Sequence, residues 1–169
     1  MPDIIFDTNV LSNFSLAERL DLLKSLYSGS ACCPGAVVTE ILHGLQCGHA
    51  GLSAISDSLS QNWPRIEDPA TATEHHLFAT LSISLGAGES SCIAMAAQRG
   101  YILACDDRLA RNEATRLGVK LTGTVGILIK AIRVEAIELK EANAILRKMV
   151  KAGFYAPVKR IEAEMVRGE

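Results

Sequence analysis

The 169-residue sequence has few aromatic residues, no long hydrophobic run and almost no net charge. No apolar stretch approaches the length of a membrane-spanning helix, and the start, Met1-Pro2-Asp3, carries no basic targeting region. We therefore expect a cytoplasmic protein without a membrane role. The formal net charge of −2 argues against binding nucleic acid through bulk charge, so any such contact must be local and assisted by a metal ion.

Cysteine is present, but not in a pattern that builds a framework. The cysteines are odd in number and include no Cys-x-x-Cys pair, which argues against a closed disulfide set and against a zinc site. We expect them to be reduced and mostly buried: Cys32, Cys33, Cys47, Cys92 and Cys105. The histidines are expected at the surface: His43, His49, His75 and His76.

Strand-like runs alternate with helical patterns along the chain. Regular alternation implies parallel strands joined by right-handed crossovers, which predicts one doubly wound α/β domain. Short apolar runs predict strands at 4–6, 31–33, 102–105 and 119–121, with a brief edge strand at Ile66. Helical spacing predicts helices from Val10 onward, with a break near Ser15, and over 36–42, 52–59, 90–99, 108–117, 125–132 and 138–150, whereas 44–53 is expected to be a loop.

Acidic residues stand where short apolar runs end and a turn or helix begins. They are Asp7, Glu40, Glu89 and the pair Asp106-Asp107. Ligands bind at the carboxyl edge of an open parallel sheet. Carboxylates crowded there repel one another unless a divalent cation lies between them, and oxygen ligands suit magnesium or manganese better than zinc. A metal-assisted reaction at phosphate is therefore the first hypothesis.

Each acid also has a simpler interpretation. Asp7, with Thr8 and Asn9 behind it, could cap the next helix, although capping needs only one such residue. Glu40 could face solvent, and Glu89 could serve only to complement a helix dipole.

The adjacent residues Asp106 and Asp107 cannot point the same way in an extended chain. We expect one to bind the metal and the other to cap the following helix or hold a second ion, with Asp106 as the first choice of ligand. Arg108 and Arg111 follow about one turn apart, and they could pair with these acids or contact a phosphate backbone.

Taken together and in order, these segments resemble the PIN-domain family, and more narrowly its VapC-like toxin branch. The resemblance covers about residues 4 to 132. The motifs that carry it are Asp7-Thr8-Asn9, Pro34-Gly35-Ala36-Val37-Val38-Thr39-Glu40, Gly86-Ala87-Gly88-Glu89, Asp106-Asp107-Arg108 and Leu121-Thr122-Gly123-Thr124-Val125.

This resemblance implies a three-layer α/β/α sandwich with a central parallel sheet. The chain is expected to form a single domain over 1–169, in which 133–169 is a helical C-terminal extension. It implies an endoribonuclease that uses Mg²⁺ or Mn²⁺, acts as the toxin of a toxin–antitoxin pair, and has an antitoxin partner and a homodimeric state. Many such nucleases have aspartate in place of Glu89. The implied catalytic cluster is Asp7, Glu40, Glu89 and Asp106, with Asp107 as a fifth member. Within it, the implied metal ligands are Asp7, Glu89 and Asp106. Thr8 and Asn9 are implied to orient the site.

Two other function classes stay open. Haloacid dehalogenase-like phosphatases also begin with a strand and an aspartate, used as a covalent nucleophile, but Asn9 stands where they generally have a second aspartate. A non-catalytic partner-binding module is the other class, and retention of every acidic position argues against it. For a partner surface we consider the early apolar residues, too many for one helix face to bury, with core packing as the alternative: Leu11, Phe14, Leu16, Leu20, Leu23 and Leu26.

Overall fold

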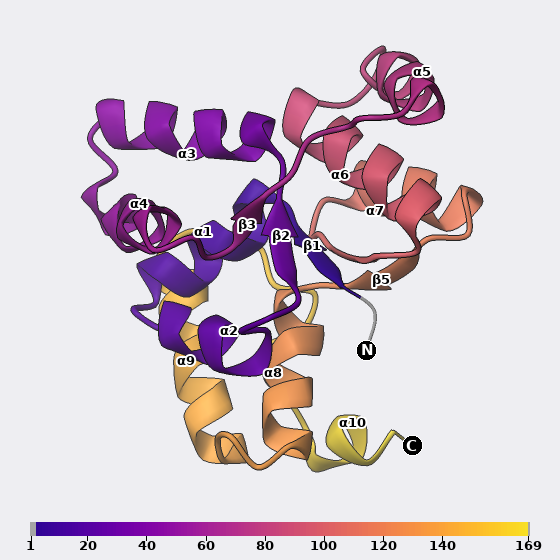
Figure 1. Ribbon diagram of the computed structural model, residues 1–169. Coiled ribbons are helices and arrows are strands. Elements are labelled where there is room, and N and C mark those ends of the chain that lie inside the picture. The colour runs from indigo at the N-terminus through magenta and orange to yellow at the C-terminus, as the bar shows by residue number, and fades with distance from the viewer. Residues whose placement is uncertain (1–2, 169) are drawn as a thin grey trace.

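The computed structural model describes residues 3–168, so residues 1, 2 and 169 of the expected domain lie outside it. Its centre is an all-parallel, five-stranded sheet in the order β3-β2-β1-β4-β5 (Figure 1). The expected three-layer α/β/α fold is confirmed. The strands are β1 (Ile4–Phe6), β2 (Ala31–Cys33), β3 (Arg65–Ile66), β4 (Ile102–Ala104) and β5 (Lys120–Thr122).

Helices cover both faces of the sheet. Helix α6 contacts α5 and α7 in one layer, whereas α1 contacts α2, α4, α8 and α9 in the other, and α3 contacts both α1 and α6 (Figure 1). No helix within residues 3–168 is long and apolar enough to cross a lipid bilayer. The helices are α1 (Thr8–Leu16), α2 (Leu20–Leu26), α3 (Gly35–Gln46), the 3-10 turn η1 (Ala50–Leu52), α4 (Ser53–Ser60), α5 (Ala72–Leu81), α6 (Ala87–Arg99), α7 (Arg108–Arg116), α8 (Thr124–Arg133), α9 (Leu139–Lys151) and α10 (Ala163–Arg167).

The core explains why β1 lies in the middle. Ile4, Ile5 and Phe6 are at most 1% exposed, and a strand that is apolar on both faces must be covered on both. The cysteines are free, and all but Cys47 are buried, as expected. The four histidines are exposed, also as expected.

Two helix predictions were wrong in extent, and one helix was missed. Helix α3 runs to Gln46, so Gly44 lies inside a helix and not in the expected loop. Helix α6 begins at Ala87, three residues before the expected start. Helix α5 was not predicted because its sequence has no clear apolar face, yet Thr71 and Glu74 form a capping box at its start.

Most of the early apolar residues considered for a partner surface lie in the core. Leu11, Phe14, Leu20 and Leu23 are buried and Leu26 packs against the core, whereas Leu16 is 38% exposed. Core packing, the alternative interpretation, therefore accounts for most of them.

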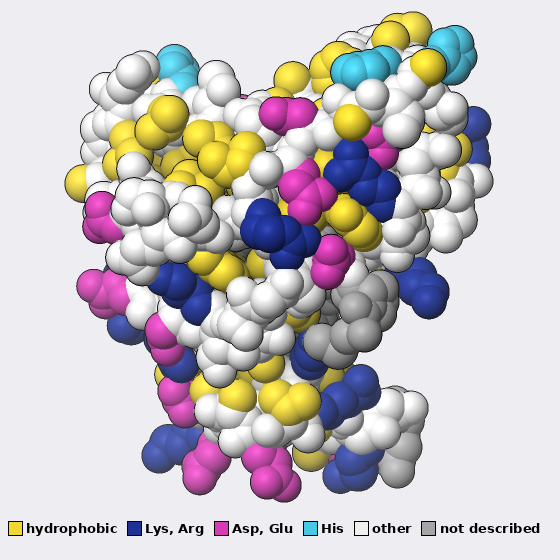
Figure 2. Space-filling view, viewed as in Figure 1, with side chains coloured by type: hydrophobic (Ala, Val, Ile, Leu, Met, Phe, Trp, Pro, Cys, Tyr) yellow, Lys and Arg dark blue, Asp and Glu magenta, His cyan; other side chains and the backbone are white. Residues whose placement is uncertain are grey.

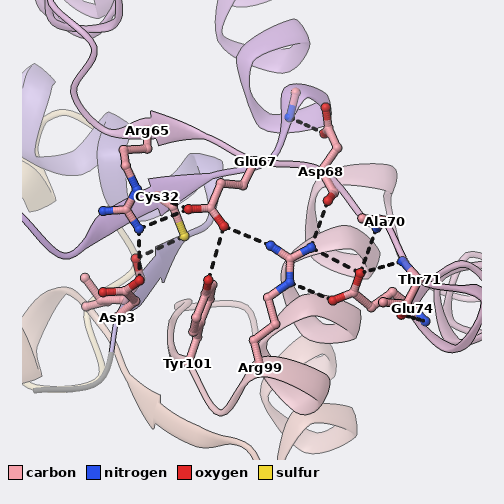
Figure 3. Close-up of polar contacts among 12 residues, drawn as sticks. Asp3, Cys32, Arg65, Glu67, Asp68, Ala70, Thr71, Glu74, Arg99 and Tyr101 are labelled. Carbon is pink, nitrogen blue, oxygen red and sulfur yellow. Dashed lines mark hydrogen bonds and ion pairs between the residues drawn. The ribbon is translucent and has the colours of Figure 1, made fainter.

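A network of charged side chains ties α5 and α6 to the sheet (Figure 3). At its centre, Nε of Arg99 donates to Oε1 of Glu74 at 2.6 Å, and Nη1 of Arg99 donates to Glu67 at 2.8 Å. Glu74 also closes the capping box of α5 by accepting from the N–H of Thr71. The hydrogen bond from Arg99 is the main cause that lowers the pKa of Glu74 from 4.5 to about 2. This buried acid is therefore fully compensated.

Replacing Arg99 with methionine should destabilise the fold strongly. Glu74, with a side chain only 1% exposed, would be left without a cation, and the free energy of unfolding should fall by about 3 kcal/mol. Urea denaturation at pH 7 measures this loss. The difference should shrink as the pH falls from 4.5 toward 2, because protonation of Glu74 removes the charge that Arg99 stabilises.

The control is Arg116→Met, which breaks the exposed Arg116–Glu113 pair of α7. Its expected loss is below about 0.5 kcal/mol, since exposed ion pairs contribute little. Equal effects of the two substitutions would show that the network is not a structural anchor.

Candidate active site

The site forms where the chain changes direction at the centre of the sheet. β1 pairs with β2 on one side and with β4 on the other, so the carboxyl ends of β1 and β4 flank a topological switch point. The N–H of Asp7 donates to the carbonyl of Ala104 at 3.0 Å, which continues this pairing by one residue. Asp7 is thereby held between two strands and is only 2% exposed.

Glu40 reaches the same place from α3. Its carboxylate accepts hydrogen bonds from the hydroxyl of Thr8 and, at 3.1 Å, from the N–H of Gly88. A Cβ at position 88 would lie 2.7 Å from Oε1 of Glu40, so glycine is what allows α6 to begin against this carboxylate. Thr8 therefore holds Glu40 through its hydroxyl, and its backbone N–H forms a hydrogen bond to Asp7.

Glu89 lies in the first turn of α6, and its Oε2 accepts from the N–H of Gly86 at 3.1 Å. Figure 2 shows a notch in the molecular surface between the lobe with α3 and the lobe with α5, and the start of α6 lies beside it in Figure 1. Glu89 is half-buried and keeps its second carboxylate oxygen free of hydrogen bonds to described residues.

Asp106, the first choice of ligand, is held by other groups. Its Oδ1 accepts from the N–H of Thr124 at 2.9 Å, and its Oδ2 accepts from the Thr124 hydroxyl at 2.6 Å and from the amide of Asn13 at 3.1 Å. Gly123 permits this approach, because a Cβ there would lie 2.6 Å from Oδ1. Asp106 thus fastens the start of α8 to the end of β4.

Asp107 caps α7 through Oδ1, which accepts from the N–H of Ala110 at 2.9 Å. Its other oxygen has no hydrogen bond to a described residue. The two adjacent acids have different roles, as expected, but the carboxylate that keeps an oxygen without a hydrogen bond belongs to Asp107 and not to Asp106.

The two arginines differ. Nη1 of Arg111 donates to the carbonyls of Cys105 at 2.7 Å and Thr122 at 2.9 Å, so it joins the ends of β4 and β5 and this nitrogen is not available to RNA. Arg108 is exposed and forms no ion pair within residues 3–168. It lines a pocket of about 420 Å³ together with Asn9, Asn13, Asp106, Asp107 and residues 153–155.

The acids repel one another. Burial, and then the negative charges of Glu89 and Glu40, raise the pKa of Asp7 from 3.8 to about 7. Partial burial, followed by the charges of Asp107 and Glu40, raises the pKa of Glu89 above its ordinary value of 4.5. Electrostatic coupling therefore joins Asp7, Glu40, Glu89 and Asp107.

The donor chemistry fits a hard divalent cation. All the atoms that could bind a metal here are carboxylate oxygens, and none of the five acids forms an ion pair with a Lys or Arg of residues 3–168. As the side chains stand, no group of three or more His, Cys, Asp or Glu within this range is arranged to hold an ion. A cation would therefore need small side-chain rotations, for which Glu89 and Asp107 each have an unused oxygen.

Sequence reasoning missed the neutral residues that position these acids. Asn13 and Thr124 hold Asp106, Gly88 donates to Glu40, and the thiol of Cys105 lies 3.6 Å from Oδ2 of Asp7. Only the first turn of α8, with its Gly123-Thr124 start after a strand, gave a signal that could have been used.

Asp7→Asn and Asp106→Asn should change stability in opposite directions when a chelator is present. Ionised Asp7 destabilises the folded state, because it is buried among like charges. Its replacement should therefore leave the free energy of unfolding unchanged or raise it by about 1 kcal/mol at pH 8. Asp106→Asn should lower it by about 1–2 kcal/mol, because an amide nitrogen would face donors. Chemical denaturation measures both.

The pH dependence checks the sign. Asp7 has a raised folded pKa, so wild-type stability should decline as the pH rises from about 4 to 7, and this decline should be smaller in Asp7→Asn. A clear loss of stability in Asp7→Asn would mean that Asp7 serves as a structural hydrogen-bond partner.

Comparison with known proteins bears on the fold and the site. The sequence model of one family, described as a PIN domain, matches residues 3–167, and curated proteins and solved structures give no match. PIN domains are typically nucleases and usually bind divalent metal ions in their active sites. The match spans nearly the whole chain and agrees with the parallel sheet and its acidic edge. The chain therefore belongs to the PIN-domain family.

Proposed function

We propose that this protein is an endoribonuclease that depends on Mg²⁺ or Mn²⁺ and hydrolyses phosphodiester bonds in RNA. One observation carries the proposal: acidic side chains from α3, α6 and the carboxyl ends of β1 and β4 repel one another and have no Lys or Arg partner among the described residues. A buried charge left uncompensated in this way is costly, so its retention favours a cation site.

Three carboxylates would hold the cation: Asp7, Glu89 and Asp107, in place of the expected Asp106. The bound cation would supply a water of lowered pKa and neutralise charge on the phosphate. Glu40 is exposed, and Thr8 and Gly88 fix its orientation, so it can accept a proton from an attacking water. Asp106 fastens α8 beside the site and acts as a positioning residue.

RNA cleavage with magnesium or manganese tests the proposal. Purified protein should cut a labelled RNA with either ion and stop in excess chelator, and Glu40→Gln or Glu89→Gln should lower the rate at least about 100-fold. The rate should rise between about pH 6 and pH 8, because a carboxylate must lose its proton to bind a metal. Full activity in excess chelator would contradict metal dependence.

Two further variants separate position from charge. Asp57→Asn removes an exposed acid of α4 and should leave cleavage unchanged. Gly88→Ala should keep the fold and displace the Glu40 carboxylate, so cleavage should fall while the melting temperature holds, whereas Gly29→Ala, with open space around its Cβ, should change neither. A phosphorylated protein intermediate with a small phosphomonoester would instead indicate a phosphatase.

The toxin role rests on the resemblance to VapC-like proteins. We propose that the protein acts with an antitoxin partner and forms a homodimer. Induction in a bacterial host should arrest growth, and the Glu40→Gln variant should not. If the wild-type protein is active on RNA and its induction leaves growth unaffected, the toxin role is wrong while the nuclease activity stands.

A further inference from the structure

An exposed aromatic side chain lies next to the acidic site. Tyr155 is 96% exposed, and it borders the pocket that contains Asp106, Asp107 and Arg108. It also borders a second pocket of about 560 Å³ along β5 and α8, and a third of about 620 Å³ along the end of α9. Phe154 and Tyr155 line all three pockets, and Tyr155 is the exposed residue of the two.

The backbone around Tyr155 is fastened at both ends of its loop. Gly153, with φ of +112°, turns the chain after α9, and the N–H of Phe154 donates to the carbonyl of Met149 at 3.0 Å. At the far end, Asn143 of α9 exchanges two hydrogen bonds with Ile161, at 2.8 and 3.0 Å. Phe154 packs against the core while Tyr155 faces solvent. The loop thus holds the ring outward on an anchored support.

The same segment is basic. Between Glu141 and Glu162 the sequence has no acidic residue, and Lys148 and Arg160 already pair with Glu18 and Glu162. The other basic residues of this segment form no ion pair within residues 3–168 and line the third pocket beside Tyr155: Arg147, Lys151 and Lys159.

We infer that Tyr155 is a stacking platform for a base of single-stranded RNA, and that Arg147, Lys151 and Lys159 bind the phosphates that lead away from the acidic site past Arg108. The inference rests on the proposed function and adds the class of substrate. An exposed aromatic ring beside unpaired cations binds single strands by stacking and charge. A paired base in a duplex does not present its face to such a ring.

The charge favours RNA over a protein as occupant. Three unpaired cations beside an aromatic ring complement a polyanion, and the path begins at carboxylates suited to a metal and a phosphate. A purely apolar partner would leave these cations uncovered. A protein interface at this surface would show instead as a change of oligomeric state in Tyr155→Ala.

Binding in a chelator tests the inference without cleavage. Anisotropy of a fluorescein-labelled, mixed-sequence single-stranded RNA of 12 nucleotides is titrated with each protein. Tyr155→Ala should weaken binding about tenfold, within the range for stacking one base on an aromatic ring, and Tyr155→Phe should bind like wild type. Lys151→Ala should weaken binding and lower the slope of log K against log salt by about 0.7.

Matched controls keep the result specific. Ile83→Ala changes another highly exposed apolar side chain, and Lys120→Ala removes an exposed lysine at the start of β5; neither should alter RNA binding. When the same RNA is supplied as a duplex, Tyr155→Ala should not change its binding affinity. Thermal melts should show all variants folded, because Tyr155 contributes little buried area.

The possible results separate the two proposals. If the wild-type protein cleaves RNA and the Tyr155→Ala variant binds RNA with unchanged affinity, this inference alone is overturned. Binding that depends on Tyr155, without any metal-dependent cleavage, would overturn the proposed function alone. If Tyr155→Ala changed only the oligomeric state in sedimentation, this surface would be a protein interface and the inference would be wrong.

Discussion

Repulsion among carboxylates at the switch point is the constraint on which the site depends. β1 is central because its three apolar residues need cover on both faces, and this position buries the aspartate that follows it. This burial, and then the charges of Glu89 on α6 and Glu40 on α3, raise the pKa of Asp7 to about 7. The fold therefore stores an electrostatic cost at one edge, and a cation of charge two would remove it.

A second acidic cluster shows that this cost is not a general property of the chain. Glu67 and Glu74 are also partly or fully buried, but Arg99 lies between them, and the pKa of Glu74 is lowered to about 2. At the switch point the groups that hold the acids are neutral: two hydroxyls, four backbone N–H groups and an amide. Neutral donors fix direction and leave the charge in place, which is what a metal site needs.

Sequence reasoning reached the strands, their parallel arrangement and the acidic edge, because each follows from local pattern: Ile4-Ile5-Phe6 runs into Asp7, and the strand ending at Ala104 runs into Asp106-Asp107. It could not decide between Asp106 and Asp107. That choice depends on Thr124 and Asn13, which lie 18 and 93 positions from Asp106 in the sequence. Helix α5 was missed for a related reason: its apolar residues form no clear helical face, and the ion pair between Arg99 and Glu74 helps to hold it to α6.

The small net charge of −2 hides a separation of charge. Five acids lie at or near the carboxyl edge of the sheet, whereas the charged residues between Glu141 and Glu162 are all basic. A polyanion approaching such a molecule gains little from its average field, because the opposite charges cancel beyond about 10 Å in salt. Under the proposed function, attraction would arise only when phosphates lie along the basic segment and a cation covers the carboxylates. Recognition at this edge would then require both parts at once, and a near-neutral chain would act on RNA locally without accumulating it over its whole surface.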